Sequence, residues 1–318
     1  MMLQVKKSGF LSLVQDYGRY GHQSIGVTNG GPLDEHAFLW ANRLLDNHYN
    51  DAQIEISYGL FSVQFFDDAM IAICGADLSA SINDIAIKPW QSYKIKAGDI
   101  VSFVSPVAGL RCYLAVKGGF TVEKQLSSCS TVVREKLGGI HQNGSKLSKG
   151  DCISYQPSQD EIIKYVPPQY RGKYDKEITL RFIPNTSPTS AGKDVLRAFT
   201  GNSYEVTSNM DRMGYRLSGN ALDTPQKGII SQGVSLGAIQ VPKDGQPIIL
   251  MKDRQTMGGY PLIGCVSYLD LSKLAQSNPG TKLSFTPVDV DEAEAELKIH
   301  QTFFGIDLKN SVENSSSP

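Results

Sequence analysis

Short apolar runs recur along the whole chain, and this pattern most narrows the folds open to it. Runs of four to seven residues, among them "AMIAIC", "DIVSFV", "RCYLAV", "ITLRFI" and "PIILM", alternate with glycine, aspartate, asparagine and proline. Runs of this length are typical of strands, whereas a globular helix needs about ten residues or more. Thirty of the 318 residues are glycine, which permits many tight turns. The pattern predicts a mainly β protein with a few helices.

Four segments have the character of helices. The clearest is 34–45, "DEHAFLWANRLL", in which Asp34 is a suitable N-cap and the apolar residues fall on one face. Shorter or more polar helices are predicted around Val195, at 270–280 and at 290–306.

A proline-rich and charged segment, 156–177, has no periodicity and is the best candidate for a linker. We therefore predict an N-terminal β-rich half at 1–165, a C-terminal β-rich half at 178–306 and a disordered tail at 307–318. Gly-Asp turns at 96–99 and 148–151 hint that parts of the chain are related, although such turns are common.

Composition excludes several classes of partner. The net charge is −1, from 31 basic and 32 acidic residues, so nothing in the charge indicates binding to nucleic acid or to an anionic membrane. No run approaches the ~20 apolar residues of a membrane span, and the first residues lack the pattern of a signal peptide. Five cysteines without zinc-ligand spacing predict reduced thiols and no metal site. We expect a cytoplasmic protein.

Candidate functional residues gather in glycine-rich segments. The first, 14–27, contains Gln15, Asp16 and Arg19, and an arginine there is suited to bind a substrate carboxylate. The alternative is a surface loop in which the aspartate caps a turn. In the second, 28–36, Asp34 precedes a helix whose N-terminus could receive an anion, although Asp34 is at least as easily read as a cap alone.

The other two segments follow strands. Lys117 lies at a strand end before two glycines, where it could reach a carbonyl or phosphate oxygen or simply be solvated. The second half of the chain carries a further group of polar candidates, which are Arg212, Gln240, Asp253, Gln255, Thr256 and Tyr260. A buried aspartate such as Asp253 could act as a base.

Familiar catalytic motifs are missing from the sequence. It has no GxxxxGK[ST] phosphate loop, no GxSxG elbow, no HExxH metal motif and no GxGxxG after a strand. These absences argue against a P-loop nucleotidase, a serine hydrolase of the α/β type, a zinc protease and a dinucleotide-binding fold.

Six segments in order resemble one known family. They are "GFLSLVQDYGRYGHQSIGVTNGGPLDEHAFLWANRLLDN", "CGADLSASIN", "LRCYLAVKGGF", "SNMDRMGYRLSG", "SQGVSLGAIQVPKDGQPIILMKDRQTMGGYP" and "LAQSNPGTKLSF". Together, over about residues 3–290, they resemble the biotin-dependent carboxyltransferase-type family, which includes allophanate-hydrolase-subunit-2-like proteins and the C subunit of bacterial 5-oxoprolinase. Two departures from the family's usual pattern are "GGPLD" in place of "SGAMD" and "QTMGGYP" in place of "QTTGGYP".

The resemblance implies a fold, partners and an activity. It implies a cyclophilin-like β-barrel architecture, which we expect in the C-terminal half. The resemblance also implies that the protein acts in a complex with two further proteins, which are the A subunit of 5-oxoprolinase and the homologous B subunit. Such a complex opens 5-oxo-L-proline to L-glutamate at the expense of ATP. Which protein of the complex binds ATP stays open.

The expected roles follow from the chemistry of a stable lactam. Its carbonyl must be activated, its carboxylate held by a cation, and a base supplied. Arg19 or Arg212 could hold the carboxylate, Lys117 and Gln255 could stabilise the amide oxygen, and Asp16 or Asp253 could be the base. The remaining substrate-binding candidates are Gln15, Asp34, Gln240, Thr256 and Tyr260.

Two alternatives stay open at this point. One is a carboxyltransferase or amidolyase component that acts on urea or an allophanate-like amide. The chain has no biotinyl-lysine "MKM" segment, so biotin would have to arrive on another protein. The other is a regulator without catalysis that binds a kinase-inhibitor homologue of the B subunit.

Overall fold

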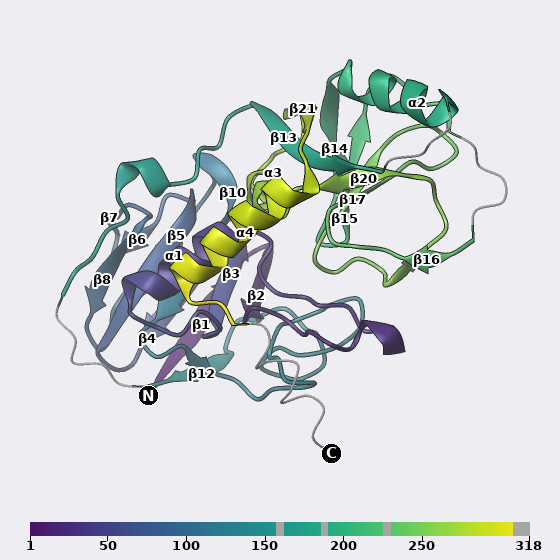
Figure 1. Ribbon diagram of the computed structural model, residues 1–318. Helices are drawn as coiled ribbons and strands as arrows, with labels where there is room; N and C mark the ends of the chain where they lie inside the picture. Colours follow the sequence, from purple (N-terminus) through teal and green to yellow (C-terminus); the bar gives the residue numbers. More distant parts are fainter. Residues whose placement is uncertain (157–161, 186–189, 225–229, 308–318) are drawn as a thin grey trace. The chain divides into compact units, whose positions relative to one another are not determined.

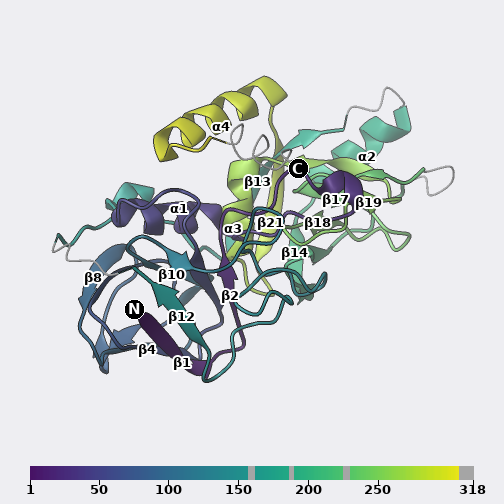
Figure 2. The same cartoon turned by 90° about the horizontal axis from the view of Figure 1, so that it is seen from below.

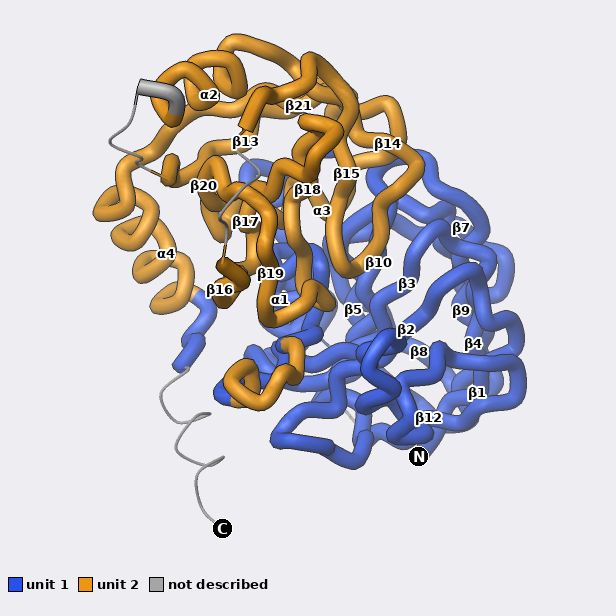
Figure 3. The backbone as a smooth tube through the Cα atoms, turned by 90° about the vertical axis from the view of Figure 1, so that its right-hand side faces the viewer, with its two compact units in different colours: residues 1–21, 29–174, 304–318 blue, residues 22–28, 175–303 orange. Residues whose placement is uncertain are grey.

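The computed structural model describes residues 1–156, 162–185, 190–224 and 230–307 (Figure 1). The chain divides into two compact units, coloured separately in Figure 3. Unit 1 comprises residues 1–21, 29–174 and 304–318, and unit 2 comprises residues 22–28 and 175–303. Each unit has its own sheets and core.

Unit 1 contains two antiparallel sheets. The strand order in the larger sheet is β11 (Phe120–Thr121), β12 (Cys152–Tyr155), β1 (Met2–Ser8), β4 (Phe61–Phe65), β9 (Ile100–Phe103), β6 (Ser81–Ile82) and β7 (Ile85–Ala86). The order in the smaller sheet is β2 (Leu11–Gln15), β3 (Gln53–Ser57), β10 (Ala108–Val116), β5 (Ala69–Asp77) and β8 (Gln91–Ile95).

The two faces of the smaller sheet are both buried, and strand β5 shows how the sequence achieves this. Ile71 and Ile73 belong to the core that the strands of both sheets share. Met70, Ala72 and Cys74 belong to a second core with helix α1 (Glu35–Leu44), which lies along this sheet in Figures 1 and 2. Successive side chains of a strand point to opposite faces, so a continuous apolar run serves a sheet that is covered on both sides.

Unit 2 is built around a closed barrel of seven strands. Their order is β13 (Glu177–Pro184), β20 (Leu262–Val266), β17 (Ala238–Gln240), β18 (Ile248–Leu250), β15 (Gly214–Ser218), β14 (Tyr204–Met210) and β21 (Lys282–Pro287). The β13–β21 pair that closes it is parallel. Closure removes exposed sheet edges and encloses an aromatic core in which the rings of Phe199 and Phe285 lie 4.3 Å apart.

Shorter elements complete unit 2. A two-stranded ribbon pairs β16 (Gln232–Gly233) with β19 (Met257–Gly258). The helices are α2 (Ser190–Thr200), α3 (Leu271–Ala275) and α4 (Val290–Phe304), of which the last residue belongs to unit 1. Single 3₁₀ turns occur at Gln23–Ile25 and Tyr268–Asp270 in unit 2 and at Pro168–Tyr170 in unit 1.

An ion-pair network around the buried Asp270 fixes strand β13 to its neighbours. Arg181 donates two hydrogen bonds to Asp270, from Nε at 3.2 Å and from NH2 at 3.1 Å. Its NH1 donates to both carboxylate oxygens of Glu296 on α4. Burial acts to raise the pKa of Asp270, but hydrogen bonds from Arg181 and Lys273 outweigh it and hold that pKa below its ordinary value. The Asp270 carboxylate therefore stabilises unit 2 in its ionised form.

The mainly β fold predicted from the sequence is confirmed, and so are the four helices. Helix α1 begins one residue after Asp34, whose Oδ1 accepts a hydrogen bond from the Ala37 amide at 3.0 Å. The other predicted helices correspond to α2, α3 and α4, with ends that differ by a few residues. The predicted tail lies almost entirely outside the described residues. Among the described residues, no helix is long and apolar enough to cross a membrane.

Candidate functional site

In unit 1, Asp16 lies at the centre of a buried polar network just after strand β2. Its carboxylate accepts hydrogen bonds from the hydroxyls of Ser128 and Ser130, the latter at 2.6 Å, and from the amides of Cys129 and Gly18, at 2.9 and 3.1 Å. Four donors occupy both carboxylate oxygens, and the residue is 1% exposed. A carboxylate held in this way orders the chain around it, and its oxygens are poorly placed to remove a proton from a substrate.

Arg19 is also buried, at 1% exposure, and it is held by backbone groups of unit 1. Its Nε and NH2 donate to the carbonyls of Gln125 and Ser128, at 3.0 and 3.1 Å. Glycine is required beside the guanidinium, because a Cβ at Gly138 would lie 2.5 Å from NH2 and the residue has a φ of +68°. The structure therefore shows Arg19 fixing the 125–128 turn.

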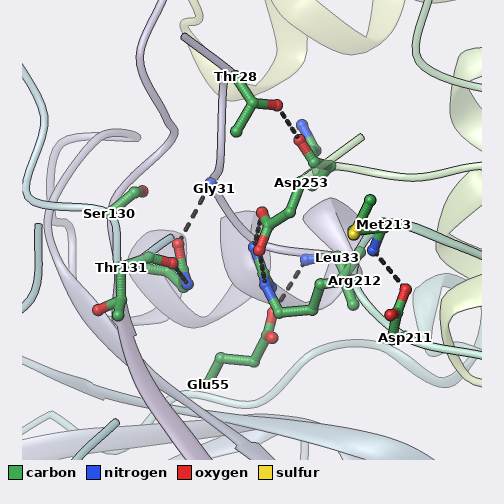
Figure 4. Close-up of polar contacts among 12 residues, drawn as sticks. Thr28, Gly31, Leu33, Glu55, Ser130, Thr131, Asp211, Arg212, Met213 and Asp253 are labelled. Carbon is green, nitrogen blue, oxygen red and sulfur yellow. Dashed lines mark hydrogen bonds and ion pairs between the residues drawn. The ribbon is translucent and has the colours of Figure 1, made fainter. Parts of the chain in front are cut away.

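Gln15 connects two segments of unit 1 with its side-chain amide. Its Oε1 accepts from the Gly31 amide at 3.2 Å, and its Nε2 donates to the Thr131 carbonyl at 3.0 Å (Figure 4). The side chain is fully buried. Both ends of the amide are thus used within the fold.

The loop before helix α1 is held by two residues that sequence reasoning missed. Glu55 accepts the Leu33 amide at 2.9 Å, and the Tyr113 hydroxyl accepts the Asp34 amide at 2.9 Å while donating to Glu55 at 2.7 Å. Burial, and then the charge of Glu55, hold the pKa of Tyr113 well above its ordinary value, so the phenol remains a donor. The Asp34 carboxylate in turn accepts from the Ala37 amide. The backbone amides of Leu33, Asp34 and Ala37 are therefore all bonded within unit 1.

Lys117 lies apart from this network, immediately after strand β10. Its Nζ donates to the Leu45 carbonyl and lies 3.8 Å from Asp46. The side chain is 27% exposed. It secures the C-terminal end of helix α1.

A surface depression of about 660 Å³ in unit 1 contains none of the predicted site residues. Aromatic and charged side chains line it, including Trp40, Tyr49, Phe304 and an ion pair between Lys164 and Asp46. The shape of this depression alone indicates no chemistry, and its ion pair is partly solvated, so the pair contributes little.

In unit 2, two neighbouring strands bring Arg212 and Asp253 together. Arg212 lies in the turn between β14 and β15, which Asp211 closes by accepting the Met213 amide at 2.7 Å. Asp253 follows β18, and β15 and β18 are paired through Gly214 and Leu250. The ends of adjacent strands meet at one edge of the barrel, so the two side chains face each other (Figure 4).

The Arg212–Asp253 pair is bidentate and almost entirely buried. Arg212 Nε lies 2.8 Å from Oδ2 and NH2 lies 2.9 Å from Oδ1, and the side chains are 6% and 5% exposed. The Asp253 amide also donates to the Arg212 carbonyl at 2.8 Å. A planar guanidinium and a carboxylate matched in this way form a strong, oriented pair of charges.

The charged residues on either side of Asp253 are buried as well. Lys252 is 3% exposed, and its carbonyl accepts from the Thr28 hydroxyl at 3.0 Å. Arg254 is 5% exposed, and its Nε donates to the Val234 carbonyl at 3.1 Å. Three consecutive buried charges at a strand end are unusual, since such residues are rarely buried unless paired.

The remaining predicted residues of unit 2 follow a gradient of exposure. Gln240, at the end of β17, is 2% exposed, whereas Tyr260 is 43% exposed. Gln255 and Thr256 are half-buried, between Arg254 and the ribbon. The structure thus places Arg212, Asp253 and Gln240 in the fold of unit 2, and Gln15, Asp16, Arg19, Asp34 and Lys117 in unit 1.

Burial raises the pKa of the thiols of Cys129 and Cys265. Burial, and then the nearby Asp16 charge, raise the pKa of Cys129 well above its ordinary value. Burial raises the pKa of Cys265 to about 11. Protonated thiols are weak nucleophiles. The described residues include no group of three or more histidine, cysteine or acidic side chains that could hold a metal ion.

Comparison with known proteins identifies the family of this chain. The carboxyltransferase domain family, subdomain A and B, matches residues 25–287. The chain is 33% identical to the 5-oxoprolinase C subunit of Escherichia coli K12 over 95% of this chain and 96% of that protein. It is 34% identical to the 5-oxoprolinase C subunit of Haemophilus influenzae over 88% and 89% of the two chains.

A solved structure extends the comparison to the fold. The K. lactis urea amidolyase matches all of this chain with a TM-score of 0.87 and 27% identity, and the chain covers 20% of that protein. The chain therefore belongs to the carboxyltransferase domain family, subdomain A and B.

Proposed function

We propose that the chain is the C subunit of an ATP-dependent 5-oxoprolinase, which opens 5-oxo-L-proline to L-glutamate together with the A and B subunits. The observation that carries this proposal is the end-to-end match with proteins named as the C subunit of 5-oxoprolinase, which covers 95% of this chain and 96% of the E. coli protein. The match to urea amidolyase covers only 20% of that protein, so most of the larger enzyme lies outside the matched region.

The charges of unit 2 suit the proposed reaction. A lactam phosphorylated on its amide oxygen carries a phosphoryl group and a carboxylate, both anionic. Arg254, Lys252 and the Arg212–Asp253 pair provide oriented charges in a region with little solvent. Electrostatic groups fixed before the reaction stabilise developing charge most strongly in such surroundings.

The proposal divides the predicted residues by role. Asp253, Arg212, Gln255 and Thr256 are assigned to the reacting end of unit 2. Asp16, Arg19, Gln15, Asp34 and Lys117 are assigned a positioning role, because their polar atoms bond to the backbone and side chains of unit 1. ATP is assigned to the complex, and which of its proteins binds the nucleotide stays open.

The test is reconstitution. Purified chain is combined with the A and B subunits, 5-oxo-L-proline and ATP, and glutamate formation is measured with each component omitted in turn. The proposal expects glutamate only when all three proteins and ATP are present. Full activity without this chain would contradict it.

Urea is the second candidate substrate, because the urea amidolyase fold matches the whole chain. Urea-dependent ATP hydrolysis in the presence of a biotinylated carrier protein would favour this alternative. We propose the lactam first, because the free-standing relatives that match end to end are named for it.

A further inference from the structure

Gln240 occupies an irregular position in the barrel of unit 2. It is the last residue of β17, and its neighbour Ile239 pairs with Gly264 on β20 while Gln240 itself pairs with Leu262. Strand β20 therefore has one extra residue at this point, which is a β-bulge. Bulges redirect side chains and are frequent beside functional sites.

The side-chain nitrogen of Gln240, Nε2, is buried without a hydrogen bond from the described part of the chain. The residue is 2% exposed, and its Nε2 has no hydrogen-bond partner. The neighbouring cluster is apolar and consists of Val234, Ala238 and Leu250 with Ile248 and Leu262 at its edge. A leucine or methionine would suit these surroundings better, because a buried N–H donor without a partner loses its hydration and gains nothing in return.

The ribbon formed by β16 and β19 covers this amide. A Cβ at Gly258 would lie 2.4 Å from Gln240 Nε2 and 3.0 Å from a methyl group of Val234, so only glycine permits the observed approach. The ribbon has two residue pairs, and the Val234 amide adds one bond to the Thr256 carbonyl at 3.0 Å. So few bonds make local opening of the ribbon inexpensive compared with unfolding of the barrel.

We propose that Gln240 is a specificity residue that recognises the cyclic amide of a lactam when the ribbon moves aside. This inference rests on the proposed function for its substrate class. A primary carboxamide presents an N–H donor and a C=O acceptor side by side. A lactam ring fixes its own N–H and C=O on the same edge, so the two groups form two hydrogen bonds at once.

The same geometry explains how an open-chain amide is rejected. A secondary amide outside a ring is almost always trans, which places its N–H and C=O on opposite edges. Such an amide can satisfy only one end of the Gln240 carboxamide and leaves the other end buried and unbonded. A polar group left without its partner costs binding, and this cost separates lactams from peptides.

The experiment is nuclear magnetic resonance of the full chain labelled with ¹⁵N-glutamine. The side-chain NH₂ signals of Gln240 are assigned by their loss in Gln240→Met. We expect 2-pyrrolidinone and 5-oxo-L-proline to shift these signals. N-methyl-2-pyrrolidinone, which lacks the N–H, and N-methylacetamide, which is trans, can make only one of the two hydrogen bonds and should shift them much less. Two results would overturn the proposal: no shift with 2-pyrrolidinone, or an equal shift with N-methyl-2-pyrrolidinone. The first is also the result expected if the Gln240 side chain binds only an ordered water.

Two matched variants separate recognition from folding. Gln15 is equally buried but donates and accepts within unit 1, so Gln15→Met should lower the melting temperature, whereas Gln240→Met should leave it unchanged or raise it. Gln232, on the exposed side of the ribbon, should tolerate methionine without change in the lactam-induced shifts. A melting temperature for Gln240→Met that falls as far as that of Gln15→Met would show a structural partner and contradict the inference.

Kinetics in the reconstituted complex distinguish failure of this inference from failure of the proposed function. Gln240→Met should raise KM for 5-oxo-L-proline about 10- to 100-fold with a smaller change in kcat. Normal kinetics for this variant in an active complex would remove the role of Gln240 and leave the function standing. An inactive complex whose Gln240 signals still respond to 2-pyrrolidinone would contradict the function and leave lactam recognition standing.

Discussion

Replacing Asp253 by Asn should destabilise unit 2 strongly. The change keeps the shape of the side chain but leaves the Arg212 guanidinium, whose side chain is 6% exposed, without the carboxylate that contacts it at 2.8 and 2.9 Å. Removing one partner of a buried ion pair costs about 3–5 kcal/mol. In a unit of this size each kcal/mol lowers the melting temperature by about 3–4 °C, so a loss of about 3–5 kcal/mol should lower it by about 9–20 °C.

Thermal unfolding followed by circular dichroism measures this decrease. The matched control is Asp244→Asn, which breaks the Arg216–Asp244 pair of the same unit, where the side chains are 34% and 47% exposed. Exposed pairs contribute about 0–1 kcal/mol, so this control should change little. A double replacement, Arg212→Met with Asp253→Leu, should recover much of the loss. An Asp253→Asn protein as stable as the wild type would show that the buried pair contributes little to the stability of unit 2.

Three further predictions concern other charged residues. Asp16→Asn should lower the urea midpoint of unit 1, because an amide oxygen cannot accept the four hydrogen bonds that the carboxylate accepts; an unchanged midpoint would show that the network is dispensable. Asp270→Asn should lower the free energy of unfolding most above pH 3.8, the pKa of an aspartate in the unfolded chain, and this loss should vanish as the pH falls through the lowered pKa of Asp270 in the folded protein. Urea titrations of the two proteins that differ by the same free energy from pH 2 to pH 7 would contradict this expectation. Lys117→Met should retain turnover in the reconstituted complex, because Lys117 bonds to the Leu45 carbonyl; loss of turnover in a folded variant would return Lys117 to the reaction.

Local sequence signals predicted the elements of the fold. Asp34 before a run with helical periodicity indicated α1, and the structure shows the cap. Short apolar runs indicated strands, because strand length and residue type are local properties. The parallel pair of β13 and β21 closes the seven strands into a barrel. Its residues lie about 100 positions apart in the sequence, so no local pattern predicts the closure.

The candidate site was harder to predict for the same reason. A polar residue in a glycine-rich loop can bind a ligand or bond to its own fold, and the two uses have the same local sequence. Asp16 meets Ser128 and Ser130, which are 112 and 114 residues away, and only that meeting shows that its oxygens are occupied. Glu55 and Tyr113 lie within apolar strands. The only feature of the sequence that could have pointed to them is a polar residue among apolar neighbours.

Unit 2 shows how far the residue types alone could lead. Arg212 and Asp253 were expected to take part in the site, but each was expected to act separately. The pairing of β15 with β18 brings them together and turns two independent candidates into one oriented pair of charges. Gln240 has no sequence signature. Its interest comes from its buried Nε2, which has no hydrogen bond among the described residues, and from the close approach of Gly258.

Reconstitution of the complex is the decisive test of the proposed function. Glutamate formation from 5-oxo-L-proline and ATP is measured in the presence of the A and B subunits, with and without this chain. We expect turnover with all three proteins and none when this chain is omitted. Equal turnover in its absence would contradict the account and direct attention to urea or another amide.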